Sequence, residues 1–470
     1  MSSKVRTRFA PSPTGFLHVG GVRTAIFAWL TAKQSSGEFV LRIEDTDQKR
    51  KVEGAEEHII ESLAWLNIKS DEPLIRQSDR VKDGIYKKWA EKLIENGRAY
   101  ADPYTPEEVQ KFREQAQTDK KPFLYRNNRP ENPPKWDGKT PLRFKAEPKE
   151  YVTHDEVMGE IKTSPEVIDD FILIKSDGFP TYNFAHIVDD LEMGITHVIR
   201  GQEFLASLPN YRNLYEALGK KEPVFVTVPH ILNEQGNKKL SKRDGAKDIL
   251  EYREQGYLPE AMMNFLATLG WNDGTEQEIF APQELLQKFQ LEQIQKGSAH
   301  FDEKRLEWIS GHHIRTKPLD ELYELVKDFW PQAAKNYDDN YKKKVLELVQ
   351  ERMKFFAELP ELTQFFFEDL PVNPELVTGH KQLKKLSNDE LESLLEKAKE
   401  TLEQSDFSRE DLQERLNQLL ETSSQKPIVL FSLIRISTTQ APASPGLAET
   451  LEVIGKETAI KRIAKQLKAL

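Results

Sequence analysis

The sequence predicts an α/β domain of the doubly wound, Rossmann type that is interrupted by an insertion and followed by an all-helical region. Three observations predict this fold class. The N-terminal third alternates short apolar strands with helices of apolar periodicity. Residues 120–140 are rich in Pro, Asn and Lys, as an insertion is and a sheet core is not. Beyond Pro318 the apolar residues recur at helical spacing, and no run resembles the N-terminal strands.

The first elements follow from periodicity and from turn residues. Val5–Phe9 alternates as a strand does, and Pro11 ends it. A helix then begins at the paired glycines Gly20 and Gly21 and stops at the turn residues 35–37. The next expected elements are a nearly all-apolar buried strand at 39–43 and helices at 55–66 and 83–96.

The insertion is expected to begin near Ala99. Thr105-Pro106-Glu107-Glu108 has the spacing of a capping box with proline at the first helical position. The α/β pattern resumes afterwards, with strands expected at 167–174, 196–199 and 225–228 and a helical stretch around 258–261. In the C-terminal region, Ser387-Asn388-Asp389-Glu390 has capping-box spacing again.

Composition excludes several classes of protein. The chain has 470 residues, a net charge of −10 and no cysteine, so disulfides and thiolate metal sites are excluded. No apolar run approaches the roughly 18 residues of a membrane span, and Met1-Ser2-Ser3-Lys4 opens no secretory leader. We therefore expect a cytoplasmic protein without a membrane partner. The acidic total argues mildly against nucleic-acid binding, although basic clusters occur at 238–243 and 456–468.

Two segments are typical of phosphate binding. His18–Gly21 opens a helix directly after a strand, where backbone N–H groups and the helix dipole attract anions. Lys239–Arg243 places Lys239 and Lys242 three residues apart, so that both ammonium groups can converge on one polyanion. Alone, the first would be an ordinary turn and the second a solvated basic loop. Together and in this order, they favour a nucleotide site.

Acidic and basic residues at strand ends suggest a second subsite. Arg8 and Arg200 end strands whose carboxyl edge is where such sheets bind ligands, and a guanidinium binds a carboxylate with two parallel bonds. Glu44, at the end of the next strand, could accept from an ammonium group. Structural salt bridges remain the alternative for each arginine. The carboxylate run Glu44-Asp45-Thr46-Asp47 and the pair Asp189-Asp190 could bind Mg²⁺, but we interpret both mainly as helix-capping and pocket-lining residues.

These segments, together with Thr7–Gly15, Arg42–Asp47 and Ser176–Tyr182, resemble the bacterial-type glutamyl-tRNA synthetases of class I. The two phosphate segments are similar to the class I signatures HIGH and KMSKS. The resemblance is specific through Gly311, and beyond it rests on length and helical character. Gly21 stands where the usual tetrad has a second histidine, a variant familiar in the glutamyl branch.

The resemblance implies an α/β Rossmann-type catalytic domain with an inserted α+β acceptor-binding domain, followed by an all-α anticodon-binding region. The expected boundaries are 1–98 for the first catalytic half, 99–185 for the inserted connective domain, 186–248 for the second half, 249–317 for a stem-contact helical region and 318–470 for the anticodon-binding region.

The implied activity is ATP-dependent formation of glutamyl-adenylate, followed by transfer of glutamate to the 3′-terminal adenosine of tRNA(Glu). The partners are ATP with Mg²⁺ as a substrate complex, L-glutamate and tRNA(Glu); we expect a monomer without zinc, since the cysteines of the zinc-binding relatives are missing.

The implied catalytic residues are His18, Lys239 and Lys242. ATP would contact Ser12, His18, Gly20, Glu203 and Lys242, and glutamate would contact Arg8, Ser12, Glu44, Tyr182, His186 and Arg200. At the position of His186 some relatives carry asparagine.

Four other functions fit this sequence less well. A glutaminyl-tRNA synthetase would have β-barrels after Pro318, and the truncated paralogue that glutamylates a modified base would lack this region. A regulatory protein without catalysis would have degraded phosphate segments. A free-standing adenylyltransferase would have no use for the insertion or the helical region. The sequence leaves open whether tRNA(Gln) is also charged and which residues read the anticodon.

Overall fold

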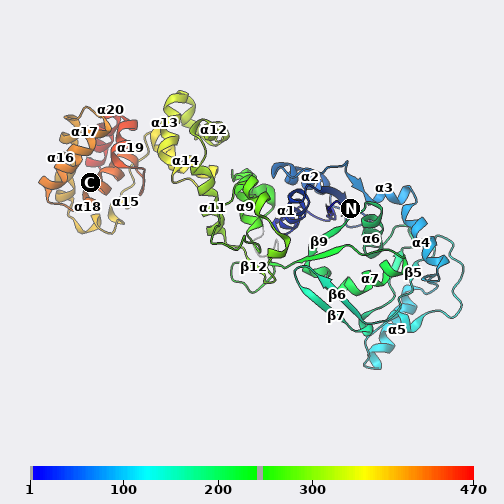
Figure 1. Ribbon diagram of the computed structural model, residues 1–470. Helices are drawn as coiled ribbons and strands as arrows, with labels where there is room; N and C mark the ends of the chain where they lie inside the picture. Colours follow the sequence, from blue (N-terminus) through cyan, green and yellow to red (C-terminus); the bar gives the residue numbers. More distant parts are fainter. Residues whose placement is uncertain (1–3, 241–246) are drawn as a thin grey trace. The chain divides into compact units, whose positions relative to one another are not determined.

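The computed structural model describes residues 4–240 and 247–470 (Figure 1). The chain forms two compact units: one contains residues up to Arg253 together with Pro259–Leu306, and the other contains Glu254–Leu258 and Glu307–Leu470. The division near Leu306 falls inside helix α11 (Glu303–Arg315), and thus before Pro318, where the sequence pattern turns wholly helical.

A parallel sheet forms the centre of the first unit. β1 (Arg6–Phe9) pairs with β2 (Glu38–Ile43), which pairs with β3 (Ile75–Arg76). β9 (His197–Gly201) pairs in parallel with β10 (Val224–Val228). The Thr196 N–H donates to the Arg6 carbonyl at 2.9 Å, so β1 and β9 lie side by side. The predicted doubly wound sheet is confirmed, and the carboxyl ends of β1, β2 and β9 share one edge.

Helix α1 (Val19–Gln34) connects β1 to β2 and packs on β1 as a crossover helix does. Its buried side chains include Val22, Ile26 and Leu30, at the spacing that the sequence pattern indicated. The remaining helices of this half are α2 (Ala55–Trp65), α3 (Gln77–Lys82), α4 (Ile85–Glu95), α6 (Tyr182–Glu192) and α7 (Leu208–Ala217).

The insertion contains its own small antiparallel sheet, formed by β4 (Ala99–Ala101), β5 (Leu142–Phe144) and β8 (Ile172–Ile174). Helix α5 (Pro106–Thr118) begins with the predicted capping box, because Thr105 and Glu108 each accept a hydrogen bond from the other's backbone N–H. Phe144 packs into the same apolar core as Phe184 of α6 and Val198 of β9. The insertion therefore shares its core with the parallel sheet.

One hairpin within residues 99–185 belongs to the parallel sheet instead. β6 (Tyr151–Asp155) and β7 (Gly159–Thr163) form an antiparallel pair, and β6 pairs in parallel with β10. Asp155 fixes this junction, since its buried carboxylate accepts from the Thr227 hydroxyl at 2.6 Å and from the Thr227 N–H at 3.2 Å. The expected strand at 167–174 is shorter, because β8 contains only its last three residues.

The segments after β10 complete the first unit. They comprise β11 (Ile231–Leu232), α8 (Ile249–Glu254), α9 (Pro259–Ala267), α10 (Pro282–Lys288) and β12 (Ala299–His300). Buried Arg23 of α1 ties them to the sheet by donating to the carbonyls of Leu269, at 2.7 Å, and Pro229.

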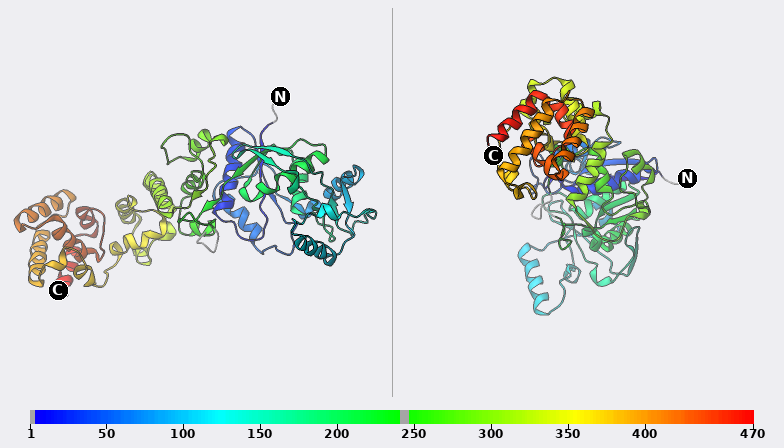
Figure 2. Two further views of the ribbon diagram at one scale, coloured as in Figure 1. Left: turned by 90° about the horizontal axis from the view of Figure 1, so that it is seen from below. Right: turned by 90° about the vertical axis from the view of Figure 1, so that its left-hand side faces the viewer.

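The regular elements described in the second unit are all helices, as predicted (Figure 2). After α11, the α-helices described in this unit are α12 (Leu319–Leu325), α13 (Asp339–Gln350), α14 (Leu359–Phe367), α15 (Glu375–Thr378), α16 (Asn388–Glu403), α17 (Arg409–Ser423), α18 (Pro427–Thr439), α19 (Leu447–Ile454) and α20 (Lys456–Leu467). Ser387 and Glu390 form the predicted capping box of α16. Asp369, just after α14, binds Arg462 of α20 at 2.9 Å and thereby joins the two helices.

Candidate active site

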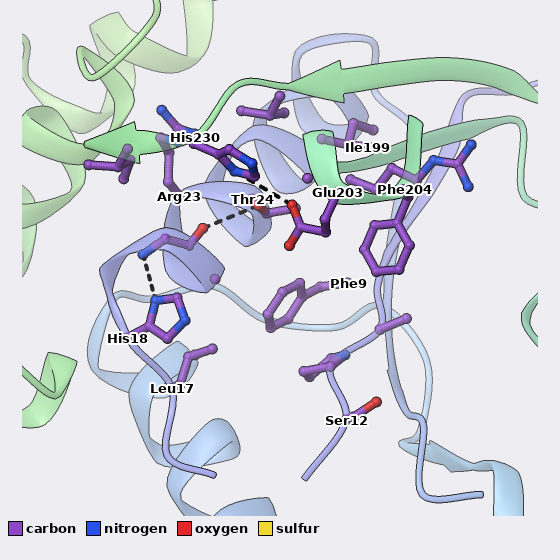
Figure 3. A pocket seen from close by; sticks show the side chains of 18 of the residues that line it. Phe9, Ser12, Leu17, His18, Arg23, Thr24, Ile199, Glu203, Phe204 and His230 are labelled. Atoms are coloured by element: carbon purple, nitrogen blue, oxygen red, sulfur yellow. Dashed lines mark hydrogen bonds and ion pairs between the residues drawn. The ribbon is translucent and has the colours of Figure 1, made fainter. Parts of the chain in front are cut away.

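A cavity of about 280 Å³ lies at the carboxyl edge of β1 and β9, beside the first turn of α1 (Figure 3). Its lining contains most of the residues that the sequence pointed to: Arg8, Ser12, His18, Gly20, Glu44, Tyr182, Arg200, Glu203 and Lys239. His186 is not among the lining residues, and Lys242 lies outside the described residues. Figure 3 shows His18 and Ser12 on opposite sides, with Phe9 between them.

The phosphate turn is capped by its own histidine. His18 is the N-cap of α1, and its Nδ1 accepts from the Gly20 N–H at 3.1 Å. Because Nδ1 accepts, the ring carries its proton on Nε2, which is thus a hydrogen-bond donor. A Cβ at Gly20 would lie 3.1 Å from His18 Cε1, so a side chain there would crowd the imidazole. The turn therefore presents an N–H donor beside a helix N-terminus, where anions are favoured.

A charged group lies across the cavity from this turn. The Lys239 ammonium is 3.4 Å from Glu203 Oε1, and His230 Nδ1 is 3.7 Å from Glu203 Oε2. Lys239 is half exposed, so its ion pair with Glu203 is open to exchange for a stronger anion. Sequence reasoning missed His230, although its place directly after β10 at the ligand-binding edge was a usable signal.

Arg200 supplies an unpaired buried cation. Only 4% of the residue is exposed, and its Nε and Nη2 have no hydrogen-bond partner among the described residues. The guanidinium lies 5.0 Å from the ring centre of Tyr211 and 4.9 Å from that of Phe225. Burial lowers the pKa of Arg200. A buried guanidinium without a carboxylate partner is costly, and it marks a place where an anion binds.

Arg8 and Glu44 provide charge of both signs in the same cavity. Arg8 is held by two bonds, from Nε to Asp190 Oδ1 at 3.1 Å and from Nη1 to the Ile199 carbonyl at 3.2 Å. Glu44 accepts from Arg42 at 2.8 Å. Burial raises the pKa of Glu44 to about 7, although Arg42 opposes this change. The cavity can therefore bind a molecule that has both an anionic and a cationic group.

Tyr182 and His186 occupy successive turns of α6. Their rings stack with centroids 4.8 Å apart, and His186 Nδ1 lies 2.7 Å from the Tyr182 carbonyl oxygen. Burial lowers the pKa of His186 to about 3, so its ring is neutral at physiological pH. His186 thus supports Tyr182 from behind, while Tyr182 itself lines the cavity.

The acidic pairs differ in their roles. Asp45 accepts from the Ser78 N–H at the start of α3, as a capping residue does. For Asp189 and Asp190 the capping and lining interpretation is wrong. Both lie in the last turn of α6, where the helix dipole disfavours carboxylates, and both are buried against arginines. Among the described residues no group of three His, Asp or Glu side chains could hold a metal ion.

Comparisons with known proteins agree with this architecture. Residues 4–308 match the family model "tRNA synthetases class I (E and Q), catalytic domain", and residues 321–467 match the model "Anticodon binding domain". No helix within the described residues is both long enough and apolar enough to span a membrane.

Named relatives are similar over their full lengths. "Glutamate--tRNA ligase 1" of Caldanaerobacter subterraneus is 39% identical, with 100% of this chain and 98% of that protein covered. The glutamate–tRNA ligase of Thermodesulfovibrio yellowstonii is 38% identical, over 99% and 100%. The crystal structure of a glutamate tRNA ligase from Elizabethkingia meningosepticum in complex with its amino acid superposes with a TM-score of 0.87 at 33% identity, covering both chains completely.

Proposed function

Because this chain belongs to the glutamate–tRNA ligases of the class I synthetase family, whose function is the aminoacylation of tRNA(Glu), we propose that the cavity beside β1 and β9 is its activation site. There the α-carboxylate of glutamate attacks the α-phosphorus of ATP. The bond from that phosphorus to the bridging oxygen breaks, and pyrophosphate leaves. The observation that carries this assignment is Arg200, a buried guanidinium without a carboxylate partner among the described residues.

The amino acid would lie between Arg200, Arg8 and Glu44. Its side-chain carboxylate accepts from the two guanidinium groups, and its α-ammonium donates to Glu44. Ser12 adds a hydroxyl at the edge of the cavity, and Tyr182, backed by His186, closes one wall. A neutral amide in place of the carboxylate would leave a buried cation unbalanced, so this arrangement favours glutamate over glutamine.

ATP would bind at the first turn of α1. The Nε2–H of His18 is placed to donate to a phosphate oxygen as charge develops on it, and Gly20, which has no side chain, lets the nucleotide approach the backbone. Lys239 would leave its ion pair with Glu203 to bind a phosphate, and the sequence motif indicates that Lys242 binds the phosphates as well. Mg²⁺ would arrive with ATP as part of the substrate, and we expect no zinc.

The second step would join the glutamyl group to tRNA. The 2′-hydroxyl oxygen of the terminal adenosine attacks the carbonyl carbon of the adenylate, AMP leaves, and the hydroxyl proton passes to a phosphate oxygen of AMP. We assign residues 99–185 to the acceptor end, 249–317 to the stem and 318–470 to the anticodon arm, with 1–98 and 186–248 as the two catalytic halves. The match of residues 321–467 to an anticodon binding domain supports the last of these assignments.

The enzyme should act in the cytoplasm as a monomer with tRNA(Glu), glutamate and ATP as its partners. Light scattering on the purified chain would measure the oligomeric state.

Pyrophosphate exchange tests the proposed site. The assay measures incorporation of labelled pyrophosphate into ATP, with glutamate or glutamine, in the presence and absence of tRNA(Glu). We expect exchange with glutamate only and only when tRNA is present. Equal exchange with glutamine would contradict the proposed pocket, and charging assays with purified tRNA(Glu) and tRNA(Gln) would show which tRNAs are substrates.

A further inference from the structure

Arg8 and Glu44, the basic and acidic walls of the proposed amino-acid pocket, are connected by hydrogen bonds through two residues that do not line the cavity. Arg8 and Glu44 line the cavity, whereas Asp190 and Arg42 do not. Asp190 Oδ1 accepts from Arg8 Nε at 3.1 Å and from Arg42 Nη1 at 2.8 Å. Arg42 Nη2 donates to Glu44 Oε1 at 2.8 Å. A continuous series of alternating charges thus connects the basic wall to the acidic wall.

Three separate elements are held together by this series. Arg8 lies on β1, Arg42 on β2 and Asp190 on α6. Arg42 is completely buried and Asp190 is 2% exposed, so the bonds between them are not weakened by water. The positions of the pocket's two walls are therefore coupled through the Asp190 carboxylate.

The geometry at Asp190 is poor for stability alone. A carboxylate pairs best with an arginine through two parallel bonds, one to each oxygen. Here one oxygen serves both arginines, while Oδ2 is buried and has no partner among the described residues. An unsatisfied buried oxygen costs about 1–3 kcal/mol. This arrangement is less stable than two separate pairs would be, but it brings the guanidinium groups of Arg8 and Arg42 to one atom, Asp190 Oδ1.

The neighbouring Asp189 provides a contrast on the same helix. It is as buried as Asp190, yet it accepts from Arg80, Gln77 and Tyr86, at 2.6 to 3.0 Å. None of these three residues lines the cavity. Asp189 Oδ2 also lies 3.6 Å from Arg42 Nε, but the two atoms form no hydrogen bond. The hydrogen bonds of Asp189 therefore anchor α6 to α3 and α4, whereas those of Asp190 go to Arg8 and Arg42.

We propose that Asp190, acting with Arg42, is a positioning residue that fixes the separation between the Arg8 guanidinium and the Glu44 carboxylate, and so fits the pocket to an amino acid of glutamate's length. The inference rests on the proposed function of this cavity. An amino acid with an ammonium at one end and a carboxylate at the other must match that separation. Aspartate, one methylene shorter, cannot reach both walls while they are held in place.

Asp190→Asn and Arg42→Lys test this proposal. Asparagine keeps the shape of Asp190 but removes its charge, and lysine keeps the charge of Arg42 but cannot hold two partners with a planar fork. In the exchange assay with tRNA(Glu), both variants should raise the KM for glutamate by roughly 10- to 100-fold, the effect of losing about 1.4–2.8 kcal/mol. The KM for ATP should stay within twofold, and the preference for glutamate over aspartate should fall.

Asp189→Asn is the matched control. It removes an equally buried charge from the adjacent position of α6, so it should lower the thermal unfolding temperature but leave the KM for glutamate within threefold. Equal increases in KM for Asp189→Asn and Asp190→Asn would overturn the proposal, because the effect would then follow from destabilisation of α6. Unchanged glutamate KM in folded Arg42→Lys would also overturn it, even if Asp190→Asn did not fold.

An Arg200→Met variant separates this inference from the function on which it rests. If Arg200→Met left glutamate use intact, the cavity would not be the amino-acid site. If Arg200→Met impaired glutamate use while Asp190→Asn and Arg42→Lys did not, the site would stand and only the positioning role would be refuted.

Discussion

Replacing Arg200 by methionine should weaken glutamate use and stabilise the ligand-free protein at the same time. The guanidinium is buried between Tyr211 and Phe225, and its Nε and Nη2 have no partner among the described residues. Without substrate the protein therefore bears the desolvation cost of a cation that no described residue neutralises. Methionine fills a similar volume with an apolar chain that suits the two aromatic rings.

The magnitude of the loss follows from the pairing that the substrate would provide. Removing one partner of a buried, hydrogen-bonded ion pair costs about 3–5 kcal/mol. At about 1.4 kcal/mol per factor of ten, kcat/KM for glutamate should fall roughly 100- to 4,000-fold. The opposite effect on stability comes from removing an unsatisfied buried group, which should gain about 1–3 kcal/mol in the free energy of unfolding. Such a gain corresponds to an increase of a few degrees in Tm.

Pyrophosphate exchange with varied glutamate and varied ATP measures the first effect, and thermal unfolding without ligands measures the second. Arg42→Met is the control, because the same substitution there leaves Glu44, Asp189 and Asp190 without their shared cation. It should destabilise the protein by about 3–5 kcal/mol. The reasoning about Arg200 would be refuted if Arg200→Met lowered Tm as Arg42→Met does, or if it impaired ATP use more than glutamate use.

Three further predictions concern the same chemistry. Lys242→Ala should slow adenylate formation roughly 100- to 1,000-fold without unfolding the protein; exchange within threefold of the unmodified enzyme would exclude Lys242 from catalysis. Burial raises the pKa of Glu44 to about 7, and only the ionised carboxylate binds the ammonium group strongly, so kcat/KM for glutamate should fall as the pH drops below about 7. If Glu44→Gln showed the same fall in kcat/KM at low pH, this explanation would be contradicted. Chelation followed by excess Mg²⁺ should restore full activity, and one tightly held zinc per chain by elemental analysis would contradict that expectation.

Local patterns predicted much of the fold. β1, α1 and β2 were found because apolar periodicity and the Gly and Ser turn residues mark them, and α5 because a capping box is a local signal. The β6–β7 hairpin was missed. Its inward positions include Thr153 and Asp155, which are polar and so do not suggest a buried strand; in the fold, Asp155 is satisfied partly by Thr227 of β10. That pairing spans more than seventy residues of chain.

The sequence predicted which types of residue line the candidate cavity and where they lie in the chain, but it did not predict the partners of each charged side chain. Arg8, Glu44 and Arg200 were found because they lie at or directly after the carboxyl ends of strands that share an edge. The sequence could not show that His18 caps its own helix or that His186 lies behind Tyr182, since both depend on side-chain directions. It also misassigned Asp189 and Asp190, because the partners of two adjacent carboxylates at a helix end cannot be read from the sequence.

The pairing of the buried arginines separates their functions. Arg42 lies within 3.6 Å of three carboxylates, and its role is to hold the protein's own charges in place. Arg8 shares one carboxylate oxygen, on Asp190, and still faces the cavity. Arg200 lies against the rings of Tyr211 and Phe225, and its Nε and Nη2 are unsatisfied by the residues described. We propose that a substrate carboxylate offsets the cost of burying Arg200, which has no carboxylate partner among the described residues. In this proposal Arg200 makes the pocket specific for an anionic side chain, and the paired arginines determine where that side chain must lie.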